Sequence, residues 1–310
     1  MPKLSHYCTA FIDLLGLSNK LDELGRIIPG GMEKKEATPF VRASIGAILN
    51  MRQRLEQWLA DFDDPERQAR MLDSLPPAMQ EDYRAAQAGK ATVQWFTDCA
   101  YINSSVDLSS PLAAIRGLLS QFAGIASAQL LLLLEGQRLR GGIETGFAMD
   151  LGSGEIIGSG STSAYRLEST VALYPRVVVG SRLWTLLEEM QTPGSFEEFT
   201  NDKRLAAVAR EQSKYLRGFI RLDFDDLPVI DPVSPQILRS MAREPFELDF
   251  GTPLENLQPE LDESYSKGDL KLYQKLKYAE KVLDRGDATW MELSASLAQP
   301  DTEGAADASG

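Results

Sequence analysis

The pattern of hydrophobic and polar positions predicts short β-strands, most of them in the first two thirds of the chain. The run YCTAFIDLL predicts a strand from Tyr7 to Leu14, because it is rich in β-branched and aromatic residues and is followed by Gly16. Residues 91–106 predict a β-hairpin with its bend at Thr97 and Asp98. Further strands are predicted at RLRGGIETGFAMDL and PRVVVG, and a second hairpin at FIRLDFDD and PVIDP.

The spacing of apolar residues predicts helices over most of the remaining chain. Between residues 32 and 88 apolar residues recur at three- and four-residue spacing. The segment DFDDPER interrupts this pattern, with Pro65 suited to the first turn of a second helix and Asp63 or Asp64 to its N-cap, which predicts a helical hairpin. Other helices are predicted at about 111–134, 159–173, 182–190 and 258–297, and the composition of residues 298–310 predicts disorder.

The order of these elements predicts an α+β fold. A strand, helices, two strands, a helix, a strand, a helix and a further strand follow one another. Such an order favours a layered sheet with helices on one face over a doubly wound α/β plan.

Composition narrows the range of functions. The 310 residues carry a net charge of −13, which argues against a surface that coats nucleic acid. The only histidine is His6, so histidine-based catalysis is not expected. Cys8 and Cys99 lie in apolar runs and are expected to be buried, reduced thiols. No signal peptide is visible and the apolar run 128–134 is too short to span a bilayer, so a cytoplasmic protein without membrane contact is expected.

Two aspartates stand where strands end. Asp13 closes the first strand, and Asp98 lies in the bend of the following hairpin. A carboxylate at the end of an apolar strand costs burial energy unless it is paired or binds a cation. If the strands are neighbours, the two carboxylates could hold two Mg²⁺ ions with substrate phosphates completing the coordination. Taken singly, a strand-ending aspartate is more often part of a solvated turn or a helix cap than a metal ligand.

A third motif is GEIIGSGSTSAYRLES, residues 154–169. Thr162 and Arg166 are four residues apart and therefore face the same way on a helix. A hydroxyl that orients a ribose and a guanidinium that meets a phosphate would suit such a face.

Taken in this order, the motifs resemble those of class III nucleotidyl cyclases, over roughly residues 7–187. In that family an aspartate on the first strand precedes a glycine, as in FIDLLGLS, and a second aspartate lies in a hairpin, as in WFTDCAY. A glycine-bounded strand follows, as in RGGIETG. More narrowly, FIDLLG, RGGIETG, AYRLE and YPRVVV are similar to the bacterial pyrimidine cyclases of the Pycsar antiphage system.

The resemblance implies a ferredoxin-like βαββαβ core sheet with covering helices. The catalytic domain would span residues 1–235, with the helical hairpin inserted at about 32–88, and a helical extension would cover 236–297. The reaction would convert a nucleoside triphosphate, UTP as first choice, to its 3′,5′-cyclic monophosphate and pyrophosphate. The partners would be a second copy in a head-to-tail homodimer and a separate effector protein that reads the product.

The resemblance also assigns roles to residues. Asp13 and Asp98 would bind two Mg²⁺ or Mn²⁺ ions, and the backbone near Leu14, Gly16 and Ser18 would contact the triphosphate. From the other subunit, Thr162 would orient the ribose and Arg166 would stabilise the transition state. Gln94 and Glu155 would read the base.

Departures from the family bear on the choice of base. The lysine that reads adenine falls at Gln94, whose amide offers both a donor and an acceptor and suits a uracil edge. No residue corresponds to the late catalytic lysine, for which Arg176 and Arg140 are candidates. The ribose-orienting asparagine is replaced by Thr162, and the interval between Asp13 and Asp98 is longer than usual.

Three other functions are compatible with these residues. The first is a cyclase for CTP, ATP or GTP. The second is a degenerate cyclase fold that binds nucleotide or a partner without chemistry. The third is a phosphohydrolase, although dinuclear sites of that class usually add histidine ligands and His6 is alone.

Overall fold

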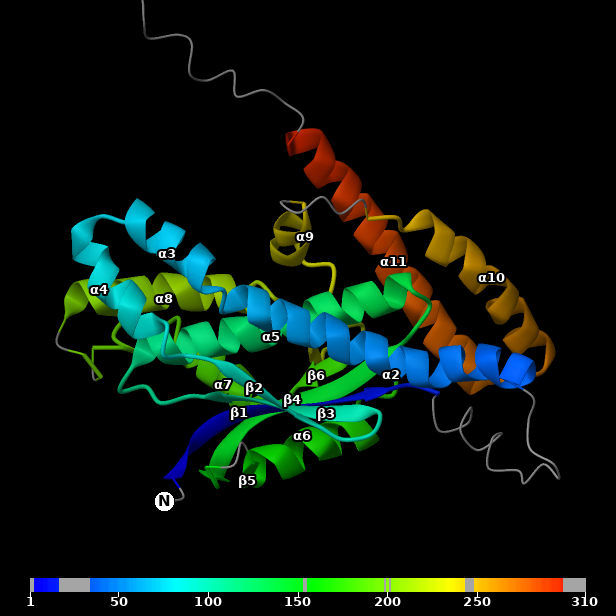
Figure 1. Cartoon of the computed structure of the whole chain (residues 1–310), viewed down its shortest axis with the longest axis horizontal. Coiled ribbons are helices and arrows are strands. Elements are labelled where there is room, and N and C mark those ends of the chain that lie inside the picture. Colours follow the sequence, from blue (N-terminus) through cyan, green and yellow to red (C-terminus); the bar gives the residue numbers. More distant parts are fainter. Residues whose placement is uncertain are drawn as a thin grey trace, which may run out of the picture. The chain divides into compact units, whose positions relative to one another are not determined.

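The computed structural model describes residues 3–16, 34–152, 155–197, 199–200, 202–242 and 248–297 (Figure 1). These residues form two compact units, one ending at Pro232 and the other beginning at Val233. Ser18 and the predicted disordered tail 298–310 lie outside the described residues.

One sheet forms the centre of the first unit. Its strand order is β2-β3-β1-β4-β6-β8-β7, and β5 pairs with β4 outside this path. The neighbouring strands are antiparallel except for β4 and β6. The strands are β1 (Lys3–Leu14), β2 (Ala91–Trp95), β3 (Cys99–Ser105), β4 (Leu139–Asp150), β5 (Ile156–Gly158), β6 (Val177–Val179), β7 (Ile220–Leu222) and β8 (Pro228–Ile230). From β1 to β4 they follow the predicted β-α-β-β-α-β order.

Helices cover both faces of this sheet, so the prediction of helices on one face was wrong. On one face α5 (Pro111–Leu134) contacts β3, where Ser104 Oγ donates a hydrogen bond to Gln121 at 2.7 Å. On the other face α6 (Ser159–Thr170) packs on β1 and β4. Figure 1 shows α5 and α6 on opposite sides of the strands. Residues 7–12 of β1 are therefore buried on both faces. Their apolar run is compatible with such burial, but it does not by itself predict a second covering layer.

The central helix α5 is the apolar core of the unit. By length and composition it could cross a membrane, but 83% of its apolar window is buried inside the protein. Its glutamines meet backbone groups, as where Gln121 Nε2 donates to the Ile102 carbonyl at 2.7 Å. The long apolar stretch therefore belongs to a helix that is buried in the core of the protein.

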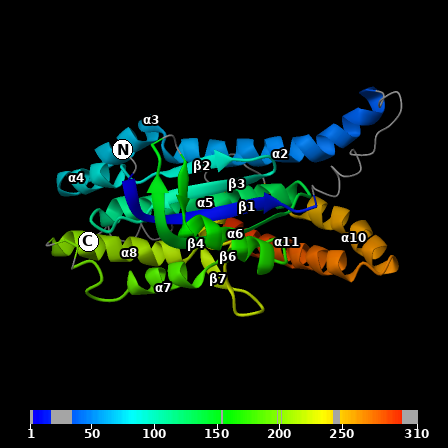
Figure 2. The same ribbon diagram turned by 90° about the horizontal axis from the view of Figure 1, so that it is seen from below.

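The inserted segment contains three helices where a hairpin of two was predicted. They are α2 (Lys34–Phe62), α3 (Pro65–Ser74) and α4 (Pro77–Ala86). Asp64 caps α3 as expected, accepting hydrogen bonds from the backbone of Glu66 and Arg67. The second break occurs at Leu75 and Pro76, where the cap residues adopt extended backbone conformations that a helix cannot continue through. Figure 2 shows α2 running beside the β2 edge of the sheet.

The helices α7 (Ser181–Glu189) and α8 (Lys203–Arg217) complete the first unit. The buried carboxylate of Glu144 on β4 accepts hydrogen bonds from the backbone of Leu183 at 2.7 Å and Arg182 at 3.3 Å. It thus satisfies donors that the first turn of α7 leaves without helical partners. The helix α8 and the short strand β5 were not predicted.

The second unit consists of α9 (Pro235–Met241), α10 (Gly251–Ser266) and α11 (Leu270–Leu297). Its core includes Leu257 and Leu261 of α10 and Leu276 and Leu283 of α11. A helical extension was predicted over 236–297, but an individual helix was placed only at about 258–297, so α9 and the earlier start of α10 were not located.

Two glycines of β4 allow α6 to lie close to the sheet. A Cβ atom at Gly142 would lie 2.4 Å from both the Ala164 carbonyl oxygen and Leu167 Cβ. At Gly146 it would lie 2.6 Å from the Gly160 backbone nitrogen. Any larger residue at these positions must move α6 away from β4.

We therefore expect Gly142→Ala to lower the free energy of unfolding by about 1–3 kcal/mol, the usual cost of overpacking. Denaturant unfolding would measure the loss. Gly251→Ala is the control, since its Cβ would meet only Asp249 Oδ1 at 3.5 Å. Equal stability of both variants would contradict this account of the α6 contact.

Candidate functional site

The two predicted metal-binding aspartates lie side by side at one end of the sheet. Asp13, the residue before the last of β1, pairs with Cys99, the first residue of β3, and Asp98 directly precedes Cys99. The Leu14 N–H donates to the Asp98 carbonyl at 3.3 Å, and the Phe96 N–H donates to the Cys99 carbonyl at 2.9 Å, which closes the turn. A backbone hydrogen bond therefore joins Leu14 and Asp98, which are 84 residues apart in sequence.

An arginine lies between two carboxylates beside this pair. Arg140 stands opposite Asp13 on β4, and its Nη2 lies 3.2 Å from Asp13 Oδ2. Its Nε lies 2.6 Å from Oε1 of Glu168, a buried residue of α6. One guanidinium thus forms ion pairs with two carboxylates, of which Asp13 is partly buried and Glu168 is buried.

Burial and mutual repulsion disfavour the charged forms of these acids. The pKa of Asp13 is raised, first because burial removes water, while the charge of Arg140 opposes the rise and that of Asp98 adds to it. Burial likewise raises the pKa of Glu168. Burial and the charges of Asp98, Asp13 and Glu168 raise the pKa of the Cys99 thiol to about 11. The site therefore holds more negative charge than Arg140 neutralises.

These donors fit a hard divalent cation. Carboxylate oxygens are the ligands that Mg²⁺ prefers, and an added cation would relieve the repulsion that raises the Asp13 pKa. Among the described residues no group of three histidine, cysteine or acidic side chains could hold a metal ion. A cation here would therefore need ligands from water or from substrate phosphates, as the sequence predicted.

A cavity of about 660 Å³ gathers the three residues that were predicted to contact the base and the ribose. Gln94, Glu155 and Thr162 all line it, although they come from β2, from the segment before β5 and from α6. Asp13, Asp98 and Arg166 are not among its lining residues. One chain thus brings the predicted base and ribose residues together, and it holds the aspartates outside this cavity.

Aromatic side chains also line the cavity, and sequence reasoning did not find them. They are Trp95, Phe96, Tyr101 and Tyr165. Phe11 connects this group toward Asp13, with ring centroids 4.8 Å from Tyr101 and 5.4 Å from Tyr165. These aromatic residues were visible in the sequence, but only strand pairing places Phe11 of β1 opposite Tyr101 of β3, next to Tyr165 of α6.

The helix α6 presents Thr162 and Arg166 on its exposed side. Thr162 Oγ1 donates only to the Gly158 carbonyl, at 3.5 Å. The Arg166 side chain makes no hydrogen bond or ion pair with any residue that the structure describes. Both groups are accessible for a ligand or for a second copy of the chain.

The predicted phosphate-binding turn is described only in part. The Leu14 N–H is engaged by the Asp98 carbonyl and is not available to a phosphate in this conformation, contrary to expectation. Gly16 adopts a positive φ of 82°, which favours glycine, and its backbone leaves the strand there. Ser18, the third residue of this set, falls in the undescribed segment.

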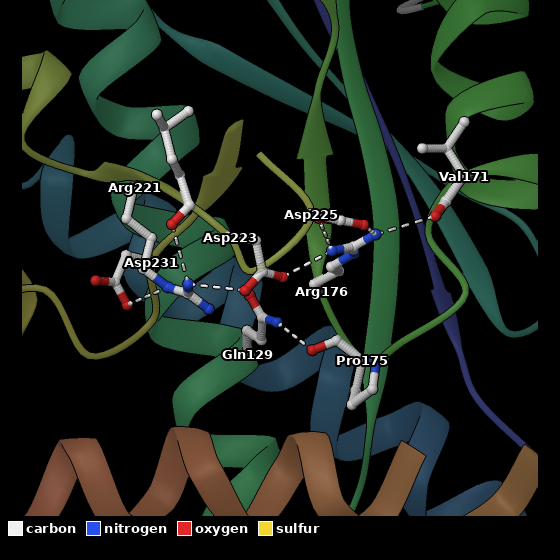
Figure 3. A network of polar contacts seen from close by, with 9 residues as sticks. Gln129, Val171, Pro175, Arg176, Arg221, Asp223, Asp225 and Asp231 are labelled. Carbon is white, nitrogen blue, oxygen red and sulfur yellow. Dashed lines mark hydrogen bonds and ion pairs between the residues drawn. The ribbon is translucent and has the colours of Figure 1, made fainter. Parts of the chain in front are cut away.

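Arg176, a candidate for the missing catalytic cation, is instead buried, and both of its terminal nitrogens donate hydrogen bonds (Figure 3). Its guanidinium donates to Asp223 at 2.7 Å and to both carboxylate oxygens of Asp225 at 2.7 and 2.8 Å. The hydrogen bond from Arg176 is the main cause of the lowered pKa of Asp225. Asp223 and Asp225 form part of a hairpin turn, as expected, but they anchor Arg176 and are not simply solvated.

Removing the buried guanidinium of Arg176 should destabilise the folded protein. We expect Arg176→Gln to lower the free energy of unfolding by about 3 kcal/mol, because the buried Asp223 would keep only Arg221, at 2.8 Å, as a cationic partner and Asp225 would lose the hydrogen bonds from Arg176. Arg70→Gln is the control, since Arg70 and Glu66 form an exposed pair at 4.0 Å whose loss should cost less than about 1 kcal/mol. Thermal unfolding of both variants would test this, and similar losses would show that the buried network contributes little.

Similarity to known proteins is limited. No protein-family model and no curated protein matches the sequence. Among solved structures, a bacterial light-regulated adenylyl cyclase aligns with 12% sequence identity and a TM-score of 0.35, over 69% of this chain. The alignment covers 59% of that protein, so the chain spans less than two thirds of its length.

Proposed function

We propose that the protein is a nucleotidyl cyclase that converts a nucleoside triphosphate to its 3′,5′-cyclic monophosphate and pyrophosphate. Two observations in each copy support the proposal: Asp13 and Asp98 meet at one end of the sheet, and Gln94, Glu155 and Thr162 line one cavity. The motif resemblance to class III cyclases predicts both groupings from residues far apart in sequence.

Asp13 and Asp98 would hold two Mg²⁺ or Mn²⁺ ions together with the substrate phosphates. When bound, the ions would lower the pKa of the ribose 3′-hydroxyl and neutralise charge on the leaving pyrophosphate. A cation at Asp13 would compete with Arg140, which contacts Oδ2 of that carboxylate. Arg140 would then keep Glu168 as its partner and be able to contact a phosphate oxygen, which makes it the remaining candidate for the missing catalytic cation.

The cavity residues would bind the nucleoside. Gln94 and Glu155 would hydrogen-bond to the base edge, Thr162 would orient the ribose, and the aromatic side chains would offer faces for base stacking. The amide of Gln94 suits uracil, so UTP is the first choice and CTP the second. ATP and GTP remain the alternatives to be tested.

The exposed position of Arg166 suggests that active sites form between two chains. In a head-to-tail homodimer Asp13 and Asp98 of one copy would meet Thr162 and Arg166 of the other, where Arg166 would stabilise charge on the α-phosphoryl group. A cyclic pyrimidine nucleotide would act as a signal read by a separate effector, as in antiphage defence.

Cys99 provides a test of cation binding that does not depend on turnover. Cys8 is fully buried, so alkylation should report Cys99 alone. Mg²⁺ at Asp13 and Asp98 should lower the raised Cys99 pKa and speed its reaction with iodoacetamide at pH 8, by about threefold for each unit of pKa.

Asp13→Asn is the matched control for that experiment. It removes one of the charges acting on Cys99, so alkylation without metal should be faster than in the unmodified protein, and Mg²⁺ should add little. An alkylation rate that millimolar Mg²⁺ leaves unchanged in the unmodified protein would argue against a cation site here.

The reaction and its base are tested by incubating the protein with each of the four ribonucleoside triphosphates and Mn²⁺. We expect a cyclic product from UTP. Asp98→Ala should abolish turnover, and Arg166→Ala should reduce it by about 10²–10³-fold, the cost of losing one transition-state donor.

Mixing these two inactive variants tests the shared site. Half of the dimers formed at random would be mixed, and each mixed dimer would have one intact site, so about a quarter of the activity should return. Failure to regain activity would refute the shared site. No cyclic product from any of the four nucleotides would refute the proposed reaction.

A further inference from the structure

The inserted helix α2 contacts the turn that carries Asp98. The Arg52 Nη2 donates hydrogen bonds to the backbone carbonyls of Phe96 and Thr97, the latter at 3.2 Å. The Arg52 guanidinium carbon lies 5.3 Å from the centre of the Trp95 ring. One turn further along α2, Glu56 accepts a hydrogen bond from Trp95 Nε1 at 2.7 Å. The helix therefore contacts the end of β2 and the turn after it through two side chains.

This turn is directly joined to the candidate cation ligands. The Thr97 hydroxyl donates to Asp98 Oδ1 at 2.8 Å, and the Asp98 carbonyl accepts from the backbone of Leu14, the residue after Asp13. A short series of contacts thus runs from Arg52 through the turn to both carboxylates. Because β2 is an edge strand, the sheet itself supports the turn on one side only.

The helix α2 is itself firmly fixed in the unit. Met51 and Leu55 on either side of Arg52 are fully buried. On another face of the helix, Arg54 forms an ion pair with Glu135 at 2.9 Å, and Asn50 donates to the same carboxylate at 3.0 Å. Arg52 therefore connects a rigid support to a turn that would otherwise be held on one side.

We propose that Arg52 is a positioning residue that sets the separation of the Asp98 and Asp13 carboxylates. The inference rests on the proposed function, since it takes these two side chains as cation ligands. A site with only two protein carboxylates depends strongly on their spacing, because ligand geometry must hold to within about half an ångström. The inserted helices would thereby support the catalytic geometry from outside the core fold.

The charge of Arg52 and its positioning role have opposite effects on the affinity for a cation. A guanidinium near a cation site repels the cation, so charge alone predicts that Arg52→Gln strengthens metal binding. A positioning role predicts that the same substitution weakens binding, because the turn loses its hydrogen bonds. The sign of the change in affinity therefore separates the two roles.

The test is Mn²⁺ binding to the nucleotide-free full-length protein, measured from the electron paramagnetic resonance signal of free Mn²⁺. We expect Arg52→Gln to weaken binding about 10-fold or more, the usual effect of losing an outer-shell partner. Arg52→Lys keeps the charge but lacks the planar fork and the stacking surface, so it should also bind weakly.

Arg54→Gln is the matched control on the same helix, since it removes the ion pair with Glu135 and leaves the turn contacts intact. Its Mn²⁺ affinity should change by less than about twofold, the scale of exposed pairs, even where its thermal stability falls as much as that of Arg52→Gln. If Arg54→Gln weakens Mn²⁺ binding equally, the effect is general destabilisation and the positioning role is refuted.

Asp13→Asn and Asp98→Asn separate this inference from the proposed function. If neither substitution weakens Mn²⁺ binding, the proposed cation site itself fails. If both do and Arg52→Gln binds Mn²⁺ as well as or better than the unmodified protein, the cation site stands and only the role of Arg52 is overturned.

Discussion

The close contact between α6 and β4 positions much of the candidate site. Gly142 and Gly146 remove the side chains that would hold the helix away, and the helix backbone lies where a Cβ atom would otherwise be. At its C-terminal end this places Glu168 against Arg140, and at its N-terminal end it places Thr162 at the cavity. A shift of α6 would therefore disturb both the charged cluster and the predicted nucleoside site.

The charged cluster is held together at an energetic cost. Burial raises the pKa of both Asp13 and Glu168, so each carboxylate is less favourable here than in water, and Arg140 offsets only part of that cost. By contrast, the Arg176 network pairs one buried guanidinium with two aspartates at short distances. The first cluster has the character of a binding site and the second that of a structural anchor.

The inserted helices connect these features to the rest of the unit. They pack on α5 through α2 and contact the β2–β3 turn through Arg52 and Glu56. The long interval between Asp13 and Asp98 thus contributes a support for the turn that carries the second aspartate. Such a support is consistent with an edge hairpin that has few other contacts on its outer side.

The sequence by itself determined the elements whose signals are local. The bend at Thr97 and Asp98, the cap at Asp64 and the bounds of α5 follow from turn chemistry, capping and periodicity within a few residues. The resemblance of separate motifs further indicated which residues should form one site, and Gln94, Glu155 and Thr162 do line one cavity.

The tertiary structure decided what depends on distant contacts. The burial of Arg176, the sharing of Arg140 between Asp13 and Glu168, and the helices on both faces arise from pairings between residues far apart in the chain. Hydrophobic periodicity shows that a face is buried, but it carries no information about which element covers it or which charge lies opposite. Those outcomes follow from strand register and helix packing, which only the folded chain fixes.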